Sequence, residues 1–129
     1  MLFRSQPYKG KVMDVDFWGT WCGPCKENMT YVKGIKEKLK GQDVVFMYFA
    51  NNSPEDSWKN IIKEMDLTGE NVVHYRLPDQ QEKLVEQLFS VTKFPTYLLV
   101  NKEGKVVNID AAAPMLGDMA IKQITELLK

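Results

Sequence analysis

Two kinds of hydrophobic pattern divide the chain. Mostly apolar runs occupy residues 12–17, 44–49 and 96–100, which is typical of strands buried within a sheet, although Asp14 and Asp16 interrupt the first run. Elsewhere apolar residues recur every three or four positions, which is the spacing of one face of a helix. This spacing predicts four helices, marked by Met29, Val32, Ile35 and Leu39; by Trp58, Ile61, Ile62 and Met65; by Leu84, Val85, Leu88 and Phe89; and by Ile121, Ile124, Leu127 and Leu128.

Turn residues separate these segments. Ser53 is predicted to cap a helix that begins at Pro54, and Gly104 is predicted to take the left-handed position in a hairpin between residues 96–100 and 105–109. Residues 72–75 form a further short predicted strand. The predicted order is βαβα(βα)ββα, in which the βα units favour parallel strands and the hairpin adds antiparallel ones. Since no linker or repeat is visible, residues 1–129 are expected to form one domain.

Composition excludes several functions. The 17 basic residues balance the 17 acidic ones, so no positive excess favours nucleic acid or anionic lipid. Hydrophobic residues are 44% of the chain, which excludes intrinsic disorder. No apolar run approaches the roughly 20 residues that span a bilayer. Residues 1–8 are too short and polar for a secretory signal and are expected to be poorly ordered.

The sequence Cys22-Gly23-Pro24-Cys25 lies between a predicted strand and a predicted helix. At the start of a helix, free backbone N–H groups and the helix dipole favour a thiolate at Cys22. Cys25 would lie inside the first turn, within reach of Cys22, and Pro24 suits that turn because no N–H is needed there. Thiolate Cys22 could attack a disulfide, and Cys25 could then attack Cys22 and release the reduced partner.

Three alternatives explain the cysteine pair less well. A structural disulfide across so short a loop would restrict the unfolded chain little. A closed zinc site needs four ligands, and His74 is the only histidine. Covalent haem attachment requires a histidine directly after the second cysteine, where this chain has Lys26. Redox chemistry is therefore the favoured interpretation.

The segment Phe-Trp-Gly-Thr-Trp-Cys-Gly-Pro-Cys-Lys at residues 17–26, together with Phe-Pro-Thr at 94–96 before a hairpin, resembles the thioredoxin superfamily. The lead-in at residues 9–12, the Trp-Gly-Thr-Trp form and the segment inserted before Phe-Pro-Thr are similar to its TlpA/ResA-like branch. This resemblance implies an α/β three-layer sandwich with a mixed central sheet and an insertion before the cis-proline strand. It also implies thiol-disulfide oxidoreductase activity outside the cytoplasm, often with a membrane anchor.

The same resemblance implies roles for individual residues. Cys22 matches the attacking cysteine, Cys25 the resolving cysteine, Asp16 the buried acid behind it, and Pro95 the cis-proline that faces the disulfide. The backbone before that proline pairs with the substrate chain in this family, a role that would fall to Phe94, which is independently expected to be extended. The implied substrate-binding residues are therefore Trp21, Gly23, Pro24, Phe94 and Pro95.

Strand alternation places Asp14 and Asp16 on one side of residues 12–17. Burial would raise the pKa of Asp16, which suits a proton shuttle to Cys25; the alternative is a hydrated carboxylate at the end of a strand. Trp18 could pack in the core or contact substrate, with neither role favoured. His74 could be a proton relay, but a partly buried or surface histidine with no catalytic role is favoured.

Three features depart from the family pattern. Asn28 stands where this branch often has a glutamate, and Glu27 precedes it. Thr30 replaces a helix-kinking proline, so the first helix is expected to be straighter. Few residues precede Lys9, so the chain is expected to be a trimmed or C-terminal domain of a longer precursor.

The functional expectation is reduction of protein disulfides by the Cys22–Cys25 pair, because the intervening Gly-Pro resembles that of reducing thioredoxins. No metal or organic cofactor is expected. The implied partners are a protein with disulfides or thiols and an upstream thiol electron donor, with the chain itself a monomer. The expected location is the periplasm or another extracytoplasmic space, with a membrane association only through an anchor in the precursor. A periplasmic isomerase or oxidase, and a non-catalytic partner-binding module, remain as alternatives.

Overall fold

The computed structural model describes residues 8–129. The chain forms, in order, β1 (Val12–Trp18), α1 (Gly23–Met29), α2 (Val32–Lys38), β2 (Val44–Ala50), α3 (Glu55–Glu64), β3 (Val72–Tyr75), α4 (Asp79–Leu88), β4 (Thr96–Val100), β5 (Val106–Asn108), the 3₁₀ helix η2 (Pro114–Leu116) and α5 (Asp118–Leu128). The expectation of poor order at residues 1–7 lies outside the described residues. Tyr8 is placed, with its hydroxyl 2.9 Å from that of Tyr75.

The strands form one mixed sheet in the order β3-β2-β1-β4-β5. β1 runs parallel to β2, and β2 runs parallel to β3, whereas β4 is antiparallel to both β1 and β5. This arrangement confirms the mixed sheet and the late hairpin. It also places β1 at the centre, with a hydrogen-bonded neighbour on each side.

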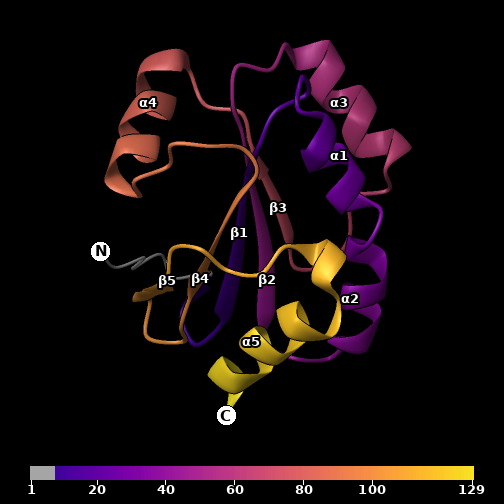
Figure 1. Ribbon diagram of the computed structural model, residues 1–129, viewed down its shortest axis with the longest axis vertical. Helices are drawn as coiled ribbons and strands as arrows, with labels where there is room; N and C mark the ends of the chain where they lie inside the picture. The colour runs from indigo at the N-terminus through magenta and orange to yellow at the C-terminus, as the bar shows by residue number, and fades with distance from the viewer. Residues whose placement is uncertain (1–7) are drawn as a thin grey trace.

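Helices cover both faces of the sheet, which gives three layers (Figure 1). Apolar residues of α1, α2, α3 and α5 pack in one hydrophobic cluster with Val12 and Trp18 of β1. The other cluster contains Met13, Val15 and Phe17 of β1 and includes Val85 of α4. Successive right-handed crossovers in one direction place their helices on the same face, which accounts for α1 to α3 lying together. The predicted three-layer sandwich is confirmed, with α4 as the separate layer.

The expectation of a straighter first helix is wrong, because the helix is broken into α1 and α2 at Thr30 and Tyr31. The N–H groups of Thr30 and Tyr31 donate to the carbonyls three residues earlier, Glu27 and Asn28, in the tighter 3₁₀ pattern. The Thr30 hydroxyl also donates to the Glu27 carbonyl at 2.7 Å. Such bonding of a hydroxyl to the preceding turn bends helices, so a threonine can end α1 without a proline.

The predicted cap at Ser53 is also wrong. Helix α3 begins at Glu55, with Pro54 in the extended cap position and no side chain capping the helix. The Ser53 hydroxyl instead accepts a hydrogen bond from the backbone N–H of Thr20 at 2.9 Å and donates to the Asn51 carbonyl at 2.8 Å. Ser53 therefore joins the β2–α3 loop to the segment that precedes the cysteines.

The helices of residues 8–129 are short. The longest of them, α5, has 11 residues. None of the helices in this part of the chain has both the length and the apolar character needed to cross a membrane.

Leu98 tests the packing of the central sheet. Its side chain is wholly buried in the cluster on the α4 face, so Leu98→Ala should lower the free energy of unfolding by about 2–5 kcal/mol through lost burial and the cavity left behind. Leu84→Ala is the matched control, since Leu84 is 59% exposed and should change stability by less than about 1 kcal/mol. Urea unfolding of both variants measures the difference; equal midpoints would contradict this packing.

Candidate functional site

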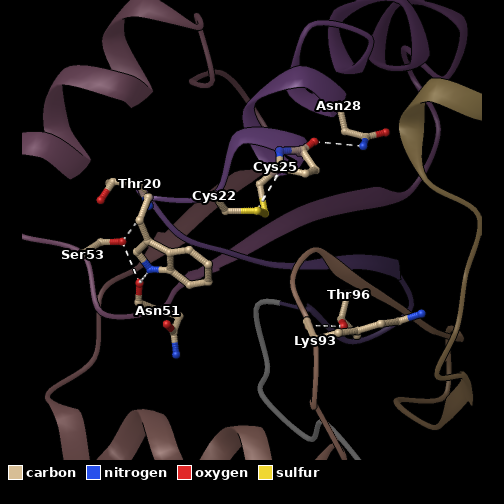
Figure 2. The surroundings of a disulfide bond; sticks show 10 residues. Thr20, Cys22, Cys25, Asn28, Asn51, Ser53, Lys93 and Thr96 are labelled. Carbon is tan, nitrogen blue, oxygen red and sulfur yellow. Dashed lines mark hydrogen bonds between the residues drawn. A yellow bond between two sulfur atoms is a disulfide. The ribbon is translucent and has the colours of Figure 1, made fainter.

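Cys22 and Cys25 form a disulfide at the amino end of α1, with their Cα atoms 5.3 Å apart (Figure 2). Cys22 occupies the N-cap position, and its sulfur accepts a hydrogen bond from the Cys25 backbone N–H at 3.2 Å. Both cysteines are buried, whereas the intervening Gly23 and Pro24 are exposed. The position of both cysteines relative to the helix was therefore predicted correctly from the sequence. Gly23 and Pro24, which link the two cysteines, are exposed residues next to the disulfide.

A second loop, more than sixty residues later in the sequence, meets the cysteine loop. Its Phe94–Pro95 peptide bond is cis, as the resemblance implies. The hydroxyl of the buried Thr96 donates to the Lys93 carbonyl at 2.6 Å, which closes the turn around the proline (Figure 2). The Phe94 ring lies edge-on to Trp21, with centroids 5.4 Å apart. Trp21 and Phe94, both predicted to bind substrate, are thus brought together.

The Trp21 side chain is held in place although it is 53% exposed. Its indole N–H donates to the Asn51 carbonyl at 2.9 Å, the same oxygen that accepts from Ser53. A methyl group on Gly19 would lie 2.4 Å from the indole nitrogen, so only glycine leaves room for the ring in this position. Sequence reasoning missed the roles of Gly19 and Asn51, because neither residue type signals a contact across the fold.

Two glutamates of α4 secure the same β2–α3 loop. The Asn51 side-chain amide donates to Glu86 at 2.7 Å, and the Asn52 backbone N–H donates to Glu82 at 2.8 Å. Glu82 is buried, and its burial raises the pKa of its carboxyl group. A helix on one face of the sheet thereby fixes the loop that holds Trp21. The spacing of four residues between the glutamates was the only sequence signal that they share a helix face.

Asn28, noted as a departure from the family pattern, has a defined structural role. Its buried side chain donates to the Pro24 carbonyl at 3.0 Å (Figure 2). The same side chain accepts from the Met115 backbone N–H at 3.0 Å. The amide therefore connects the exposed part of the cysteine loop to η2, which precedes the final helix. A glutamate could accept the second hydrogen bond but could not donate the first.

Asp16 lies on the sheet face that carries the disulfide. It belongs to the same alternating set as Val12 and Trp18, which pack in one cluster with both cysteines. Strand pairing places Tyr48 on one side of Asp16 and Tyr97 on the other. Burial, and then the charge of Asp14, raises the pKa of Asp16 well above its usual range. The expected buried acid is therefore present on the expected face.

Trp18 and His74 complete the residues weighed from the sequence. Trp18 is wholly buried in the cluster with the cysteines, so its side chain packs in the core and does not reach the surface. His74 stacks on Tyr48, with ring centroids 4.7 Å apart, and one ring nitrogen lies against the Leu67 carbonyl. Burial lowers the pKa of His74. Its packing fits the interpretation of a histidine without chemistry.

A family model described as thioredoxin-like matches residues 10–106, which is most of the chain. The chain therefore belongs to the thioredoxin-like family. Among curated proteins, it is 34% identical to a thiol-disulfide oxidoreductase ResA of Bacillus cereus over 99 residues, which covers 77% of this chain and 54% of that protein. It is 29% identical to ResA of Bacillus thuringiensis subsp. konkukian over 95% of this chain and 64% of that protein.

Solved structures agree with this assignment. The crystal structure of the thioredoxin domain of a thiol-disulfide oxidoreductase from Bacteroides vulgatus matches with a TM-score of 0.79 and 25% identity, covering 95% of this chain and 83% of that one. A thiol:disulfide interchange protein from a Bacteroides species has the same fold, with a TM-score of 0.77, 23% identity, and coverage of 95% of this chain and 76% of that one. The chain spans less than two-thirds of the length of both curated relatives.

Gly19→Ala tests how Trp21 is held. The added methyl group should displace the indole and break its hydrogen bond to Asn51, so the Trp21 indole N–H resonance should shift in a ¹H–¹⁵N spectrum. Gly34→Ala is the control, because a methyl group there meets no atom within 4 Å. An unchanged Trp21 resonance in Gly19→Ala would show that the ring does not need this space.

Proposed function

We propose that this chain is a thiol-disulfide oxidoreductase that reduces disulfide bonds in protein substrates. The observation that carries the proposal is the Cys22–Cys25 disulfide at a helix N-terminus, bordered by the cis-proline loop. Membership of the thioredoxin-like family supports it, as do the names of the curated relatives. The Cys22–Cys25 pair is the redox group, and the chemistry requires no metal or organic cofactor.

The proposed reaction proceeds in two exchange steps. In the reduced protein, Cys22 reacts as the thiolate, which the Cys25 backbone N–H is positioned to stabilise. Its sulfur attacks a substrate disulfide and forms a mixed disulfide. Cys25 loses its proton to Asp16 and attacks the Cys22 sulfur, which re-forms the Cys22–Cys25 bond and releases the second substrate thiolate. Two electrons pass from the cysteine pair to the substrate disulfide.

The surface around the disulfide suits an extended polypeptide. In this proposal Trp21, Gly23 and Pro24 of the cysteine loop and Phe94 and Pro95 of the cis-proline loop form that surface, and the Trp21 and Phe94 rings are in contact. Backbone groups before the cis-proline would pair with the substrate chain as an added strand. An exposed aromatic ring beside this backbone offers apolar contact that tolerates different substrate sequences.

The proposed setting follows the branch that the sequence resembles. The chain would act as a monomeric domain in the periplasm or another extracytoplasmic space, held at a membrane only by an anchor elsewhere in the full-length protein. Each turnover leaves Cys22 and Cys25 oxidised, so a separate thiol protein must return two electrons to them.

Trapping the mixed disulfide tests the two cysteine roles. Cys25→Ala should accumulate a covalent complex with insulin as the substrate, because the resolving step is lost, and the complex should dissociate in dithiothreitol. Cys22→Ala is the matched control and should form little complex, since it removes the cysteine at the N-cap, whose sulfur accepts the Cys25 backbone N–H. Non-reducing gel electrophoresis measures both. Partner binding that survives Cys22→Ser unchanged would instead indicate a non-catalytic module.

The reduction potential tests the direction of electron transfer. The wild-type pair, equilibrated in dithiothreitol and glutathione buffers and followed by tryptophan fluorescence, should show a value near or below about −250 mV, on the thioredoxin side of the scale. A value above about −180 mV would contradict the reducing role and would assign the chain to the oxidases and isomerases.

A further inference from the structure

A small cavity lies beneath α2, on the disulfide face of the sheet. Its volume is about 10 Å³, which is room for about one water molecule. The cavity brings together acidic and phenolic groups from the three central strands. Its lining residues are Asp14, Asp16, Val32, Ile35, Phe46, Tyr48, Tyr97 and Pro114.

Two buried polar atoms at this cavity lack a hydrogen-bond partner among residues 8–129. They are the Asp16 Oδ1 atom and the Tyr97 hydroxyl, on side chains that are 6% and 5% exposed. Leaving such atoms unsatisfied costs stability, and the cavity that they line has room for about one water molecule that could bond to both of them.

Asp14 differs from Asp16 in its access to solvent. The two aspartates face the same side of β1, two residues apart, which places their side chains at roughly 7 Å spacing along the strand. Asp16 is buried, whereas Asp14 is only half-buried. Asp14 is therefore the acid that connects the cavity to solvent, and Asp16 is the acid on the side of the cysteines.

In the part of the chain that the structure describes, no positively charged group lies at the cavity to neutralise Asp14 and Asp16. Tyr48 comes from β2 and Tyr97 from β4, and nearby Asp14 and Asp16 raise the pKa of both phenols beyond the burial effect. Within the described chain, no basic side chain lines the cavity; α2 contributes Val32 and Ile35, and η2 contributes Pro114. The buried residues of α5 are Ala120 and Ile124. Lys36 of α2 interacts with Asp66 and His74 instead.

We propose that Asp14 is a second proton carrier of the site, passing to solvent the proton that Asp16 takes from Cys25. The inference rests on the proposed function. In the resolving step, the Cys25 thiol gives its proton to Asp16, a bond forms between the Cys25 and Cys22 sulfurs, and the bond from Cys22 to the substrate sulfur breaks. The substrate sulfur leaves with the electron pair, and Asp16 returns to its charged form by passing the proton to Asp14 and on to solvent.

The test separates the two exchange steps with an aromatic disulfide, dithiobis(nitrobenzoate), which releases one coloured thiolate when Cys22 attacks and a second when Cys25 resolves. Reduced wild-type protein should give two phases, and Cys25→Ala only the first. Asp14→Asn should leave the first phase unchanged. Its second phase should slow about tenfold at the high-pH plateau, which is less than the roughly 10²–10⁴-fold effect of a group that itself takes the reacting proton, because Asp14 only relays the proton. The midpoint of its pH profile should move to lower pH, because the Asp14 charge that raises the pKa of Asp16 is gone.

Controls distinguish the possible failures. Asp16→Asn should slow the second phase at least as much, and Glu27→Gln, which removes an exposed carboxylate of α1, should change neither phase. A missing second phase in the wild type would overturn the proposed function. A second phase slowed by Asp16→Asn, with the rate and midpoint of Asp14→Asn equal to wild type, would overturn the role of Asp14 alone.

Stability gives an independent measurement in the oxidised protein, where the cysteines do not titrate. Burial raises the pKa of Asp14 to about 7, against about 3.9 in an unfolded chain. Between these values the folded protein holds a proton that the unfolded chain has lost, so the free energy of unfolding should fall as pH rises from about 4 to about 7. Asp14→Asn should fold and should reduce this slope; an unchanged slope would show that the fold does not raise the pKa of Asp14.

Discussion

The central position of β1 is the constraint on which the rest of the structure depends. With β2 hydrogen-bonded on one side and β4 on the other, the register of β1 is fixed along its length. A shift by one residue would exchange its faces and move Asp14 and Asp16 into the apolar cluster of Met13, Val15 and Phe17. Burying two carboxyl groups there would be costly, so the correct register is strongly favoured. In that register β1 ends at Trp18, and the cysteine loop follows directly.

The loop beyond β1 is held by residues from distant parts of the chain. The Asn51 carbonyl accepts hydrogen bonds from Trp21 and Ser53, and the Asn51 side-chain amide donates to Glu86 of α4. On the opposite side, Asn28 joins the cysteine loop to η2. These bonds come from elements on both faces of the sheet. The disulfide is therefore surrounded by a preorganised surface, which suits binding of an extended chain at low entropic cost.

The sequence predicted the parts of the site that local patterns determine. The cysteines three residues apart before a helix follow from helix chemistry, and the shared side of Asp14 and Asp16 follows from strand alternation, whereas the buried acid at Asp16 and the cis-proline at Pro95 were implied by the family resemblance. Sequence patterns did not reveal Asn51 and the α4 glutamates, because their hydrogen-bond partners lie 30 or more residues away in the chain. Gly19 was missed because no local pattern shows that the Trp21 ring lies against it. The break between α1 and α2 was missed for a related reason. Thr30 was judged by the absence of proline, whereas its hydroxyl bonds back to the helix and bends it.

The buried acids show how function and stability oppose each other in this fold. Burial raises the pKa of both Asp14 and Asp16, which shows that the fold disfavours their charged forms. Replacing them by apolar residues would remove this cost of burying carboxyl groups. Their placement on the disulfide face, between tyrosines that cannot neutralise them, instead keeps two acids with raised pKa values close to the cysteines. A buried thiol such as Cys25 has no direct access to solvent, so its proton must leave through protein groups. An acid at the cysteine end and a second at the solvent end meet that requirement, and the central strand supplies both positions because its side chains alternate.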